Sequence, residues 1–533
     1  MHEVELRYTF LLNCDIITNI EHTYDFVILG GGMGGLSMGA LLAEQGNSVC
    51  IVEGHSVVGG YAHTIKQGKY AFCHEVQYLM GCEKGGPVHQ FLEKIGLSSE
   101  VQFNELDEKC FDLISIKNKR IGIPHGIENF EKSLVALYPE HAKSLHRYFD
   151  VLRQISNESE EFDRIITKWD LFLHPIKHRH LLHFRNYTLH DLFEELKLPK
   201  ELRAILAGQT GNLSASPKHV SLPMYAAMQV ACCRSTHFPK KGMGFFVDSI
   251  VRKILSHDSC KIMTNCMVEG VHCQDGLVTH IETAKGTIRG RNFVSNIDPR
   301  RTMQLIYGFK LPKSYCKKIH YEYSDSVFNL YLGLKNIDLK KYGFGRRNIW
   351  HHSIFDPDRE YMTEIKKDDF SHPWLFISTP SMNTDEGVLA PKGSHTMEVL
   401  TFVNYDHFRH LADTDPKTFE AMKTDLAEHM LDIIDKNYLP NIRSFIDLKI
   451  IHTPLDVEKM LHSPKGNVYG CSVTPQNYNV NRITSDTPIP NLHLVGATAS
   501  YPGMMGVILG SMTLFREQFE KQNPYCNSNE TKR

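Results

Sequence analysis

The sequence predicts an α/β fold in which a parallel sheet is combined with a second, mixed sheet. A short apolar run at 25–29 leads into a glycine-rich turn and a helical segment, and a second apolar run follows at 49–52. Short apolar runs of this kind are typical of parallel strands that are buried on both faces. Residues 261–298 alternate apolar and polar side chains between glycine turns, which indicates an antiparallel meander. Further strand-like runs, expected to form the second sheet, lie at 326–334, 374–378 and 397–403.

Composition limits the class of protein. The chain has 533 residues and a formal net charge of -2, with 59 Lys and Arg against 61 Asp and Glu. Because a nucleic-acid binder would show an excess of basic residues, we expect no nucleic-acid partner. The 13 cysteines are scattered without a C-x-x-C pair, which favours a reducing compartment. The first twenty residues contain acids among short apolar stretches and lack the pattern of a secretory signal. We therefore expect a cytoplasmic protein.

The glycine-rich turn after the first strand has the spacing G-x-G-x-x-G at Gly30, Gly32 and Gly35. In such a turn the first glycine permits the tight bend, the second lets a pyrophosphate approach the backbone, and the third lets helix and strand pack closely. The helix expected at 36–44 offers its N-terminal N–H groups to the phosphates. Glu53, directly after the second strand, is placed to bind the adenosine ribose. Together these features predict a Rossmann-type dinucleotide-binding unit.

A glycine doublet, Gly59-Gly60, follows Glu53. An NAD-only dehydrogenase would not need it. With this doublet the segment resembles the FAD-containing amine-oxidase-like superfamily, and within it the group of phytoene desaturases, carotenoid isomerases and retinol saturases. The resemblance implies that FAD is the cofactor and that the doublet runs under its diphosphate and flavin. It also implies a glutathione-reductase-like FAD domain with an inserted mixed-sheet substrate domain and a helical lid.

The C-terminal part of the chain resembles the same group. Residues 491–512 contain a strand-like run, then Gly496-Ala497, then a Pro-Gly turn into a helical run. A helix N-terminus near Gly506 and Val507 would stabilise the negative charge that develops at the N1/C2=O edge of a reduced flavin. The resemblance further implies that Val268 reaches the adenine through its backbone. Residues 238–244 match as well, although Lys241 stands where the group usually has Gly.

The matching segments predict how the domains are divided. We expect a discontinuous FAD domain formed by 22–85, 236–300 and 456–522. A substrate-binding sheet domain is expected from 86–129 and 301–455. Residues 130–235 are expected to form a helical, membrane-facing subdomain, in which Thr188 is a candidate cap for the following helix.

One stretch, residues 72–78, departs from the group. Many members have F-D-x-G-x-H-Y where this chain has Phe-Cys-His-Glu-Val-Gln-Tyr, so that Cys73 replaces Asp, Glu75 replaces Gly and Gln77 replaces His. Since a tuned carboxylate or imidazole suits proton transfer, we hypothesise that His74 or Glu75 moves a proton near the flavin. The alternative is a surface loop with ordinary side chains.

Residues 171–190 contain no acid and interleave Lys177, Arg179, Arg185 and several histidines with Leu, Phe and Ile. Such a segment can lie on an anionic bilayer surface, which would give peripheral membrane contact. An ordinary solvated face is the alternative. No metal site is predicted here, because His178 and His180 do not share a helix face.

The resemblance implies an FAD-dependent oxidoreductase that acts on an apolar conjugated substrate, a carotenoid- or retinoid-like polyene. Desaturation, saturation and cis–trans isomerisation at the flavin all stay open, as does the oligomeric state. One alternative is an amine-oxidase-type enzyme acting on a small donor. Another is a flavin- or lipid-binding protein without turnover, which the replacements at Cys73, Glu75 and Gln77 bring into consideration.

Overall fold

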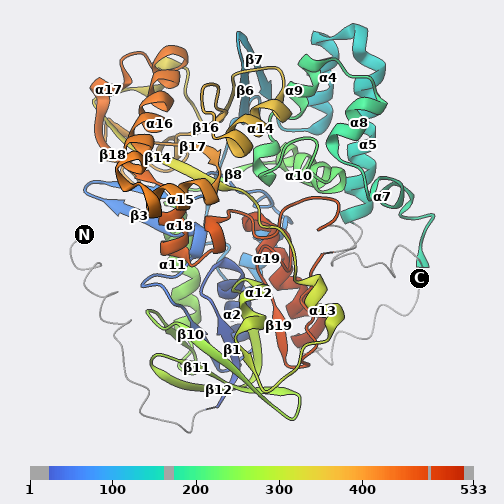
Figure 1. Cartoon of the computed structure of the whole chain (residues 1–533), viewed down its shortest axis with the longest axis vertical. Coiled ribbons are helices and arrows are strands. Elements are labelled where there is room, and N and C mark those ends of the chain that lie inside the picture. The colour runs from blue at the N-terminus through green and yellow to red at the C-terminus, as the bar shows by residue number, and fades with distance from the viewer. Residues whose placement is uncertain (1–22, 161–172, 478–481, 521–533) are drawn as a thin grey trace.

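The structure is a computed structural model that describes residues 23–160, 173–477 and 482–520. Its lower part in Figure 1 is built on an eight-stranded sheet with the order β13-β10-β11-β12-β1-β2-β9, and β19 also pairs with β12. These strands are β1 (Thr23–Leu29), β2 (Val49–Val52), β9 (Lys261–Met263), β10 (Val268–Gln274), β11 (Leu277–Thr283), β12 (Gly286–Ser295), β13 (Ile306–Tyr307) and β19 (Leu492–Leu494).

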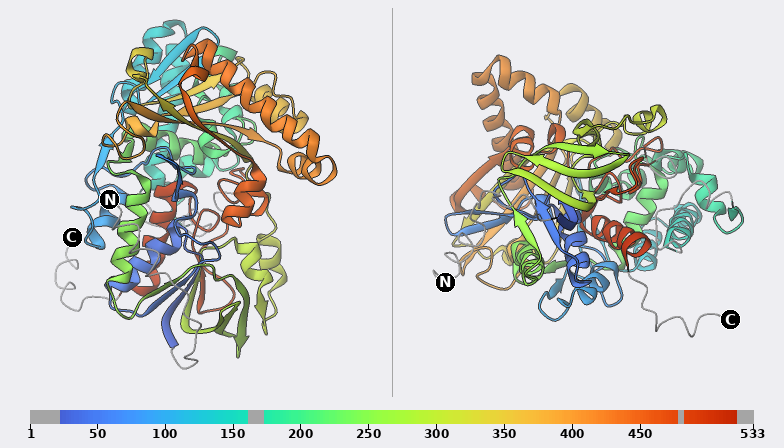
Figure 2. Two further views of the ribbon diagram at one scale, coloured as in Figure 1. Left: turned by 90° about the vertical axis from the view of Figure 1, so that its left-hand side faces the viewer. Right: turned by 90° about the horizontal axis from the view of Figure 1, so that it is seen from below.

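The centre of this sheet is parallel. β1 pairs in parallel with β2 and with β12, and β12 pairs in parallel with β19. Both β1 and β2 end in fully buried apolar runs, as expected of strands covered on both faces. Helices α2 (Met33–Glu44), α11 (Gly242–Leu255) and α19 (Gly503–Leu514) lie side by side against the sheet (Figure 2). The strands therefore bring the two ends of the described chain together in one layer.

Two local differences from the sequence-based expectation have simple causes. α2 begins at Met33 rather than at Leu36, because the small residues Gly34 and Gly35 let the first helical turn start directly against the glycine turn. The predicted meander is correct for β10, β11 and β12, which pair antiparallel. The preceding strand, β9, instead joins β2 in parallel at the edge of the sheet.

The upper part of the molecule contains a seven-stranded sheet with the order β18-β14-β17-β16-β15-β6-β7. It is mixed, as predicted, because β15 and β6 are parallel while the other pairs are antiparallel. The strands are β6 (Asp112–Ile116), β7 (Lys119–Ile123), β14 (Ser326–Lys335), β15 (Asn348–His352), β16 (Leu375–Ser378), β17 (Ser394–Val403) and β18 (Ile446–His452).

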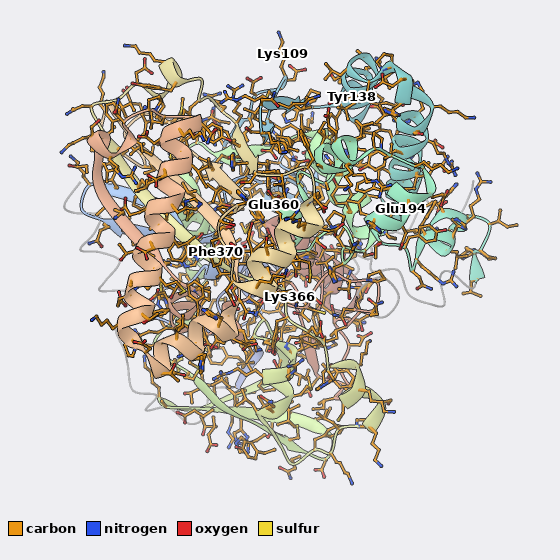
Figure 3. The ribbon with its side chains drawn as sticks, turned by 45° about the horizontal axis from the view of Figure 1, so that its top comes forward. Lys109, Tyr138, Glu194, Glu360, Lys366 and Phe370 are labelled. Atoms are coloured by element: carbon orange, nitrogen blue, oxygen red, sulfur yellow. The ribbon has the colours of Figure 1, made fainter. Side chains whose placement is uncertain are left out.

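Helices surround this second sheet. The long helix α16 (Pro416–Asn437) crosses it diagonally (Figure 2), and buried side chains of α16 share an apolar core with β14, β16 and β17. Glu360 and Lys366, labelled near the middle of Figure 3, mark α14 (Pro357–Lys367). The other helices here are α15 (Tyr405–Thr414), α17 (Ile442–Phe445) and α18 (Pro454–Leu461).

A helical region stands beside the second sheet (Figure 1), with Tyr138 and Glu194 labelled on it in Figure 3. Its helices are α4 (Ile127–Leu137), α5 (Ala142–Glu160), α7 (Arg179–Phe184), α8 (Leu189–Glu195), α9 (Lys200–Leu206) and α10 (Leu222–Arg234). The cap predicted at Thr188 is confirmed: its Oγ1 accepts a hydrogen bond from the Asp191 N–H at 3.2 Å, and Asp191 bonds back to the Thr188 N–H.

Short elements connect these three regions. They are β3 (Thr64–Gln67) paired with β4 (Tyr70–Cys73), β5 (Phe103–Glu105) paired with β8 (His237–Pro239), and the helices α3 (Pro87–Lys94), α12 (Pro299–Gln304) and α13 (Lys313–Lys318). β13, from the segment expected to belong to the substrate domain, adds to the edge of the first sheet. Residue 22 and residues 521–522 of the predicted FAD domain lie outside the described residues.

Candidate functional site

A cavity of about 700 Å³ lies between the first sheet, the second sheet and the helical region. Of the residues that the sequence singled out, the cavity is lined by Gly30, Gly32, Glu53, Gly59, Gly60, Glu75, Val268, Gly496, Ala497, Gly506 and Val507. Gly35 and His74 do not belong to the lining and lie behind it. Segments that are hundreds of residues apart in the sequence therefore build one wall.

The floor of the cavity is backbone without side chains. The Gly59 N–H donates a hydrogen bond to the Gly31 carbonyl at 2.8 Å, so the glycine turn and the glycine doublet are joined. A Cβ atom at Gly60 would lie 3.3 Å from the Cα of Gly32. Gly30 has φ +94°, in the region that favours glycine. The two glycine segments thus leave an open groove that ends at the N-terminus of α2.

Gly35 serves packing rather than the cavity itself. A Cβ atom there would lie 2.2 Å from the carbonyl oxygen of Gly30 and 3.2 Å from Cγ2 of Ile28. The absence of a side chain therefore lets α2 lie directly on β1, which sets the position of the helix N-terminus.

The carboxylate of Glu53 is fixed at one edge of the groove. The Gly31 N–H donates to its Oε2 at 2.7 Å, and the His55 N–H donates to its Oε1 at 2.8 Å. Two backbone donors hold the group in one orientation beside the glycine turn. Val268, the first residue of β10, lies farther along the same wall.

The far end of the chain closes the groove. Gly496 has φ +97° and follows β19, and α19 begins at Gly503, so Gly506 and Val507 lie in the first turn of that helix. A Cβ atom at Gly506 would lie 2.4 Å from the Tyr501 carbonyl oxygen. This turn can therefore only form tightly because glycine stands there, and it directs the N-terminus of α19 at the cavity.

Asn296 is a lining residue that sequence reasoning did not select. Its Oδ1 would be 2.5 Å from a Cβ atom at Gly34 and 3.0 Å from one at Gly496. The side chain thus separates the two glycine segments at the carboxyl end of β12. Asn296 could have been identified from its position directly after a predicted strand, because ligands of open α/β sheets bind outside the carboxyl ends of the strands.

These features fit a dinucleotide cofactor. The side-chain-free floor leaves room for a pyrophosphate, two helix N-termini face the cavity, and a fixed carboxylate stands where a ribose would bind. Within the described part of the chain, no group of three or more His, Cys, Asp or Glu is arranged to hold a metal ion.

The departing segment 72–78 is buried rather than a surface loop. His74 is fully buried, and the Glu75 side chain is 8% exposed and lines the cavity. Oε1 of Glu75 accepts a hydrogen bond from Asn329 Nδ2 at 2.7 Å and lies 3.6 Å from Nδ1 of His74. Burial raises the pKa of Glu75 to about 8, although the Asn329 bond lowers it. Glu75 is therefore protonated in good part at neutral pH.

Cys73 and Gln77, the replaced residues on either side of Glu75, contact a second buried carboxyl group. The Cys73 N–H donates to Oε1 of Glu398 at 2.9 Å, and Gln77 Nε2 lies 3.4 Å from its Oε2. Burial raises the pKa of Glu398 to about 8. Cys73 and Gln77 thus connect the segment to β17, which holds Glu75 at the cavity.

The part of the cavity beneath the second sheet is aromatic. Ring centroids of Trp350 and Phe376 are 4.5 Å apart, and those of Trp374 and Phe402 are 4.8 Å apart. All four side chains line the cavity, together with Leu400, Met224, Met228 and Met504. Tyr78 and Asn212 are polar members of this wall, joined by a hydrogen bond of 2.6 Å. Such a surface is suited to a flat, apolar ligand.

The cavity also reaches the helical region at Ser156 and Ser159 of α5 and at Leu181 and Arg185 around α7. The segment 171–190 lies here, at the outer edge of the molecule (Figure 1), although residues 171 and 172 fall outside the described residues. Leu173 is 63% exposed and Ile176 is 87% exposed. No helix in the described ranges has the length and apolar character needed to span a bilayer.

Comparison with known proteins agrees with this geometry. Residues 28–95 match the family described as NAD(P)-binding Rossmann-like domain. The chain is 22% identical to all-trans-retinol 13,14-reductase of Danio rerio, over 93% of this chain and 86% of that protein. It is also 22% identical to chloroplastic prolycopene isomerase of Daucus carota, over 91% of this chain and 78% of that protein. These similarities support an FAD-dependent oxidoreductase.

The fold of this chain is also found in solved structures. A triple mutant of putrescine oxidase superposes with a TM-score of 0.63 at 13% identity, over 93% of this chain and 98% of that chain. At this identity the likeness concerns the fold. The predicted α/β class with a Rossmann-type unit and a mixed-sheet insertion is thereby confirmed.

Proposed function

We propose that this protein binds FAD and uses it to change the saturation or the cis–trans geometry of a double bond in an apolar polyene of the carotenoid or retinoid class. The observation that carries the proposal is one continuous cavity that joins the glycine-floored groove to the aromatic wall of Trp350, Trp374, Phe376 and Phe402. A flat conjugated ligand on that wall would share one cavity with the flavin.

The residues that would hold FAD are those of the groove. Glu53 would accept hydrogen bonds from the adenosine ribose, and Val268, which lines the same cavity, would contact the adenine through its backbone. Gly32, Gly59 and Gly60 would leave room for the diphosphate at the N-terminus of α2. The first turn of α19 would stabilise negative charge on the pyrimidine edge of the flavin. When bound, FAD supplies two-electron chemistry, which the side chains of this chain do not provide.

The chain itself contributes orientation, exclusion of water and proton transfer. The aromatic wall would align the conjugated plane of the ligand and displace water from the cavity. Glu75, protonated because of its burial, would exchange a proton with a carbon or oxygen of the bound ligand. Two relatives carry names that state a polyene substrate, retinol and prolycopene, which supports the substrate class.

The test is spectroscopic. The purified protein is examined for a flavin spectrum, reduced anaerobically by light, and mixed with retinol, with a carotene or with an amine. Prompt reoxidation by a polyene, or its isomerisation by the reduced protein, is the expected result. Reaction with the amine alone would establish the amine-oxidase alternative. A bound flavin that reacts with neither a polyene nor an amine would establish a binding protein.

We also propose that this protein is cytoplasmic and draws its substrate from a membrane through residues 173–190. The exposed side chains of Leu173 and Ile176 come shortly before α7 in the chain, and Leu181 and Arg185, in and after α7, line the cavity. A polyene that leaves the bilayer at this place would enter the cavity without crossing water. The cysteines among the described residues are free thiols, as expected in a reducing compartment.

A further inference from the structure

His74 occupies an unusual position behind the cavity wall. Its ring is fully buried, and neither ring nitrogen has a hydrogen-bond partner among the described residues. Burying polar atoms without partners costs free energy, so a side chain of this kind calls for a functional reason. Oε1 of Glu75 lies 3.6 Å from Nδ1 of the His74 ring. His74 thus stands directly behind the carboxyl group that faces the ligand.

A second, smaller cavity is lined by His452, a neighbour of His74. It is lined by Gly54, His55, Ser56, Asn265, His452, Asp456, Lys459, Met460 and His462, and has a volume of about 440 Å³. His452 is the last residue of β18, and its ring centroid lies 5.9 Å from that of His74. Nδ1 of His452 also has no hydrogen-bond partner among the described residues. The two cavities adjoin at Gly54, His55, Met460 and His462, which line both. Away from that edge, two imidazoles with unused nitrogens lie between Glu75 and the second cavity.

We propose that Glu75, His74 and His452 form a proton relay between the main cavity and the second cavity. This inference rests on the proposed function, because it assigns the route by which the reaction would exchange a proton with water. At a centroid separation of 5.9 Å, ring rotation or one intervening water brings the nitrogens within hydrogen-bonding reach.

The balance of the relay is simple. His452 takes a proton from water in the second cavity on one nitrogen and releases the proton of its other nitrogen to His74. His74 passes a proton to Glu75 in the same way, and Glu75 gives its own proton to the ligand. Each group ends with the number of protons it had at the start, and water supplies the one transferred. Removal of a proton from the ligand runs along the same groups in reverse.

A relay is needed because the substrate would close the direct path. An apolar ligand that fills the main cavity excludes water from it, so Glu75 could not be reprotonated from that side. Adding two hydrogens to a double bond, or removing them, transfers one proton separately from the electron pair. None of the aromatic wall residues lines the second cavity, so a ligand on that wall would leave the second cavity available to water.

The groups around His74 favour passage of a proton over its retention. Its ring centroid lies 5.1 Å from that of His63 and 6.0 Å from that of Tyr61, and Tyr331 donates a hydrogen bond to its carbonyl oxygen at 2.7 Å. Burial, and then the neighbouring His63, His452 and His55, hold the pKa of His74 well below its usual value. A protonated His74 would therefore be short-lived and would pass its proton to Glu75.

His452 is tuned by the groups on its own side. Burial lowers the pKa of His452, Asp456 in the second cavity raises it, and His63 lowers it again. Glu398, the other carboxyl group near Glu75, bonds to Cys73 and Gln77 and does not line either cavity. It is therefore a matched buried carboxyl group outside the relay.

The experiment measures the exchange of the Glu75 carboxyl proton with solvent. The protein is saturated with all-trans-retinol, which fills the main cavity, and is mixed with deuterated water. The shift of the protonated carboxyl C=O band is followed by infrared spectroscopy, and Glu75→Gln and Glu398→Gln assign the two buried carboxyl groups. We expect His452→Ala to slow exchange at Glu75 by roughly a hundredfold, and free imidazole to restore it. Exchange at Glu398 should not respond to imidazole.

His74→Gln keeps the size of the side chain and should slow exchange as much, without rescue by imidazole. His280→Ala, on β11 and away from both cavities, is the control and should leave exchange unchanged. Unchanged exchange at Glu75 in His452→Ala would overturn the relay, and so would slow exchange that imidazole does not restore. If His74→Gln does not fold, His452→Ala decides alone. The measurement is made on the protein with its cofactor bound and needs no turnover, so failure of the proposed function is seen separately, in the reoxidation experiment.

Discussion

The hydroxyl group of Tyr78 donates a hydrogen bond of 3.4 Å to the buried carboxylate of Asp112. Tyr78 lines the main cavity, and Asp112 lies behind it, where Trp350 Nε1 and Asn348 Nδ2 donate to the same carboxylate at 2.8 and 3.1 Å. Burial raises the pKa of Asp112 to about 6, so the group is ionised at neutral pH. Its charge directs the Tyr78 proton away from the cavity. The phenolic oxygen accepts a hydrogen bond from Asn212 Nδ2 at 2.6 Å and keeps one further acceptor position for a ligand.

This arrangement predicts a preference for ligands that carry a hydroxyl group. In Tyr78→Phe the acceptor is lost, and we expect the Kd for retinol to rise about tenfold, the equivalent of about 1.4 kcal/mol. The Kd for a hydrocarbon polyene should change little. Quenching of tryptophan fluorescence measures both, since Trp350 and Trp374 line the cavity. Tyr307→Phe, at an exposed position on β13, is the control. Equal weakening of both ligands would contradict the prediction and indicate lost packing.

The contact between α2 and β1 predicts how flavin binding depends on Gly35. In Gly35→Ala the new Cβ would start 2.2 Å from the Gly30 carbonyl oxygen, so the helix must move away from the strand. We expect loss of bound flavin and a destabilisation of about 1–3 kcal/mol. The ratio of flavin to protein absorbance in the purified protein measures the first, and thermal unfolding the second. Gly345→Ala, where a Cβ meets no atom within 4 Å, should change neither. Full flavin content in Gly35→Ala would contradict this role for the contact.

The pKa of Glu75 predicts the pH dependence of stability. Because the value in the folded protein, about 8, exceeds the ordinary value of 4.5, the folded state binds the extra proton between these two pH values. Stability from this group is therefore present below pH 4.5 and is lost as pH rises through 8. Glu75→Gln stays neutral, so we expect it to exceed the wild type in stability at pH 9, by an amount on the order of 4 kcal/mol, and to match it near pH 4.

The midpoints of thermal unfolding at pH 4, 6 and 9 measure this difference. Glu398→Gln is the matched comparison, since burial raises the pKa of Glu398 to about 8 as well. It should flatten the same pH profile while leaving ligand binding as in the wild type, because Glu398 does not line the cavity. A Glu75→Gln profile as steep as that of the wild type would mean that Glu75 is ionised in the folded protein.

The nucleotide groove could be predicted from the sequence because its requirements are local. Gly30 needs a positive φ, Gly35 needs a close approach between two elements that follow each other in the chain, and Glu53 directly follows its strand. Each requirement is met within a short stretch, so the residue type and its spacing reveal it. The start of α2 was predicted at Leu36, three residues too late, because glycine is a poor helix former and the packing on β1 outweighs that tendency.

The ligand side of the cavity could not be predicted in the same way. Asp112 meets Trp350 only because β6 pairs with β15, and Asn296 reaches Gly496 only because β12 pairs with β19. His452 reaches His74 through the second sheet. Nothing in the residues near these positions distinguishes them from ordinary strand residues. Their roles arise from strand pairing between distant segments, which hydrophobic periodicity does not encode.

The exposed side chains of Leu173 and Ile176 predict how the protein binds membranes. We expect wild-type protein to float with vesicles of phosphatidylcholine and phosphatidylserine, and the double variant Leu173→Ser, Ile176→Ser to float much less. Two buried aliphatic side chains contribute about 1.5–3 kcal/mol each, so a loss of at least about tenfold in partitioning is expected. Binding should be weaker on phosphatidylcholine alone, since Lys177 and Arg179 favour an anionic surface.

The control is Leu137→Ser, at the end of α4, where the side chain is 57% exposed but does not line the cavity. It should float as the wild type does. If both variants lost binding equally, general surface hydrophobicity would explain the flotation. If the wild type did not float on either vesicle, the segment would be an ordinary solvated face. Supplying the polyene in two ways distinguishes membrane docking from the reaction itself. The double variant should react with a polyene in detergent as the wild type does, but react slowly with a polyene in vesicles. The reason is that only entry from the bilayer depends on Leu173 and Ile176.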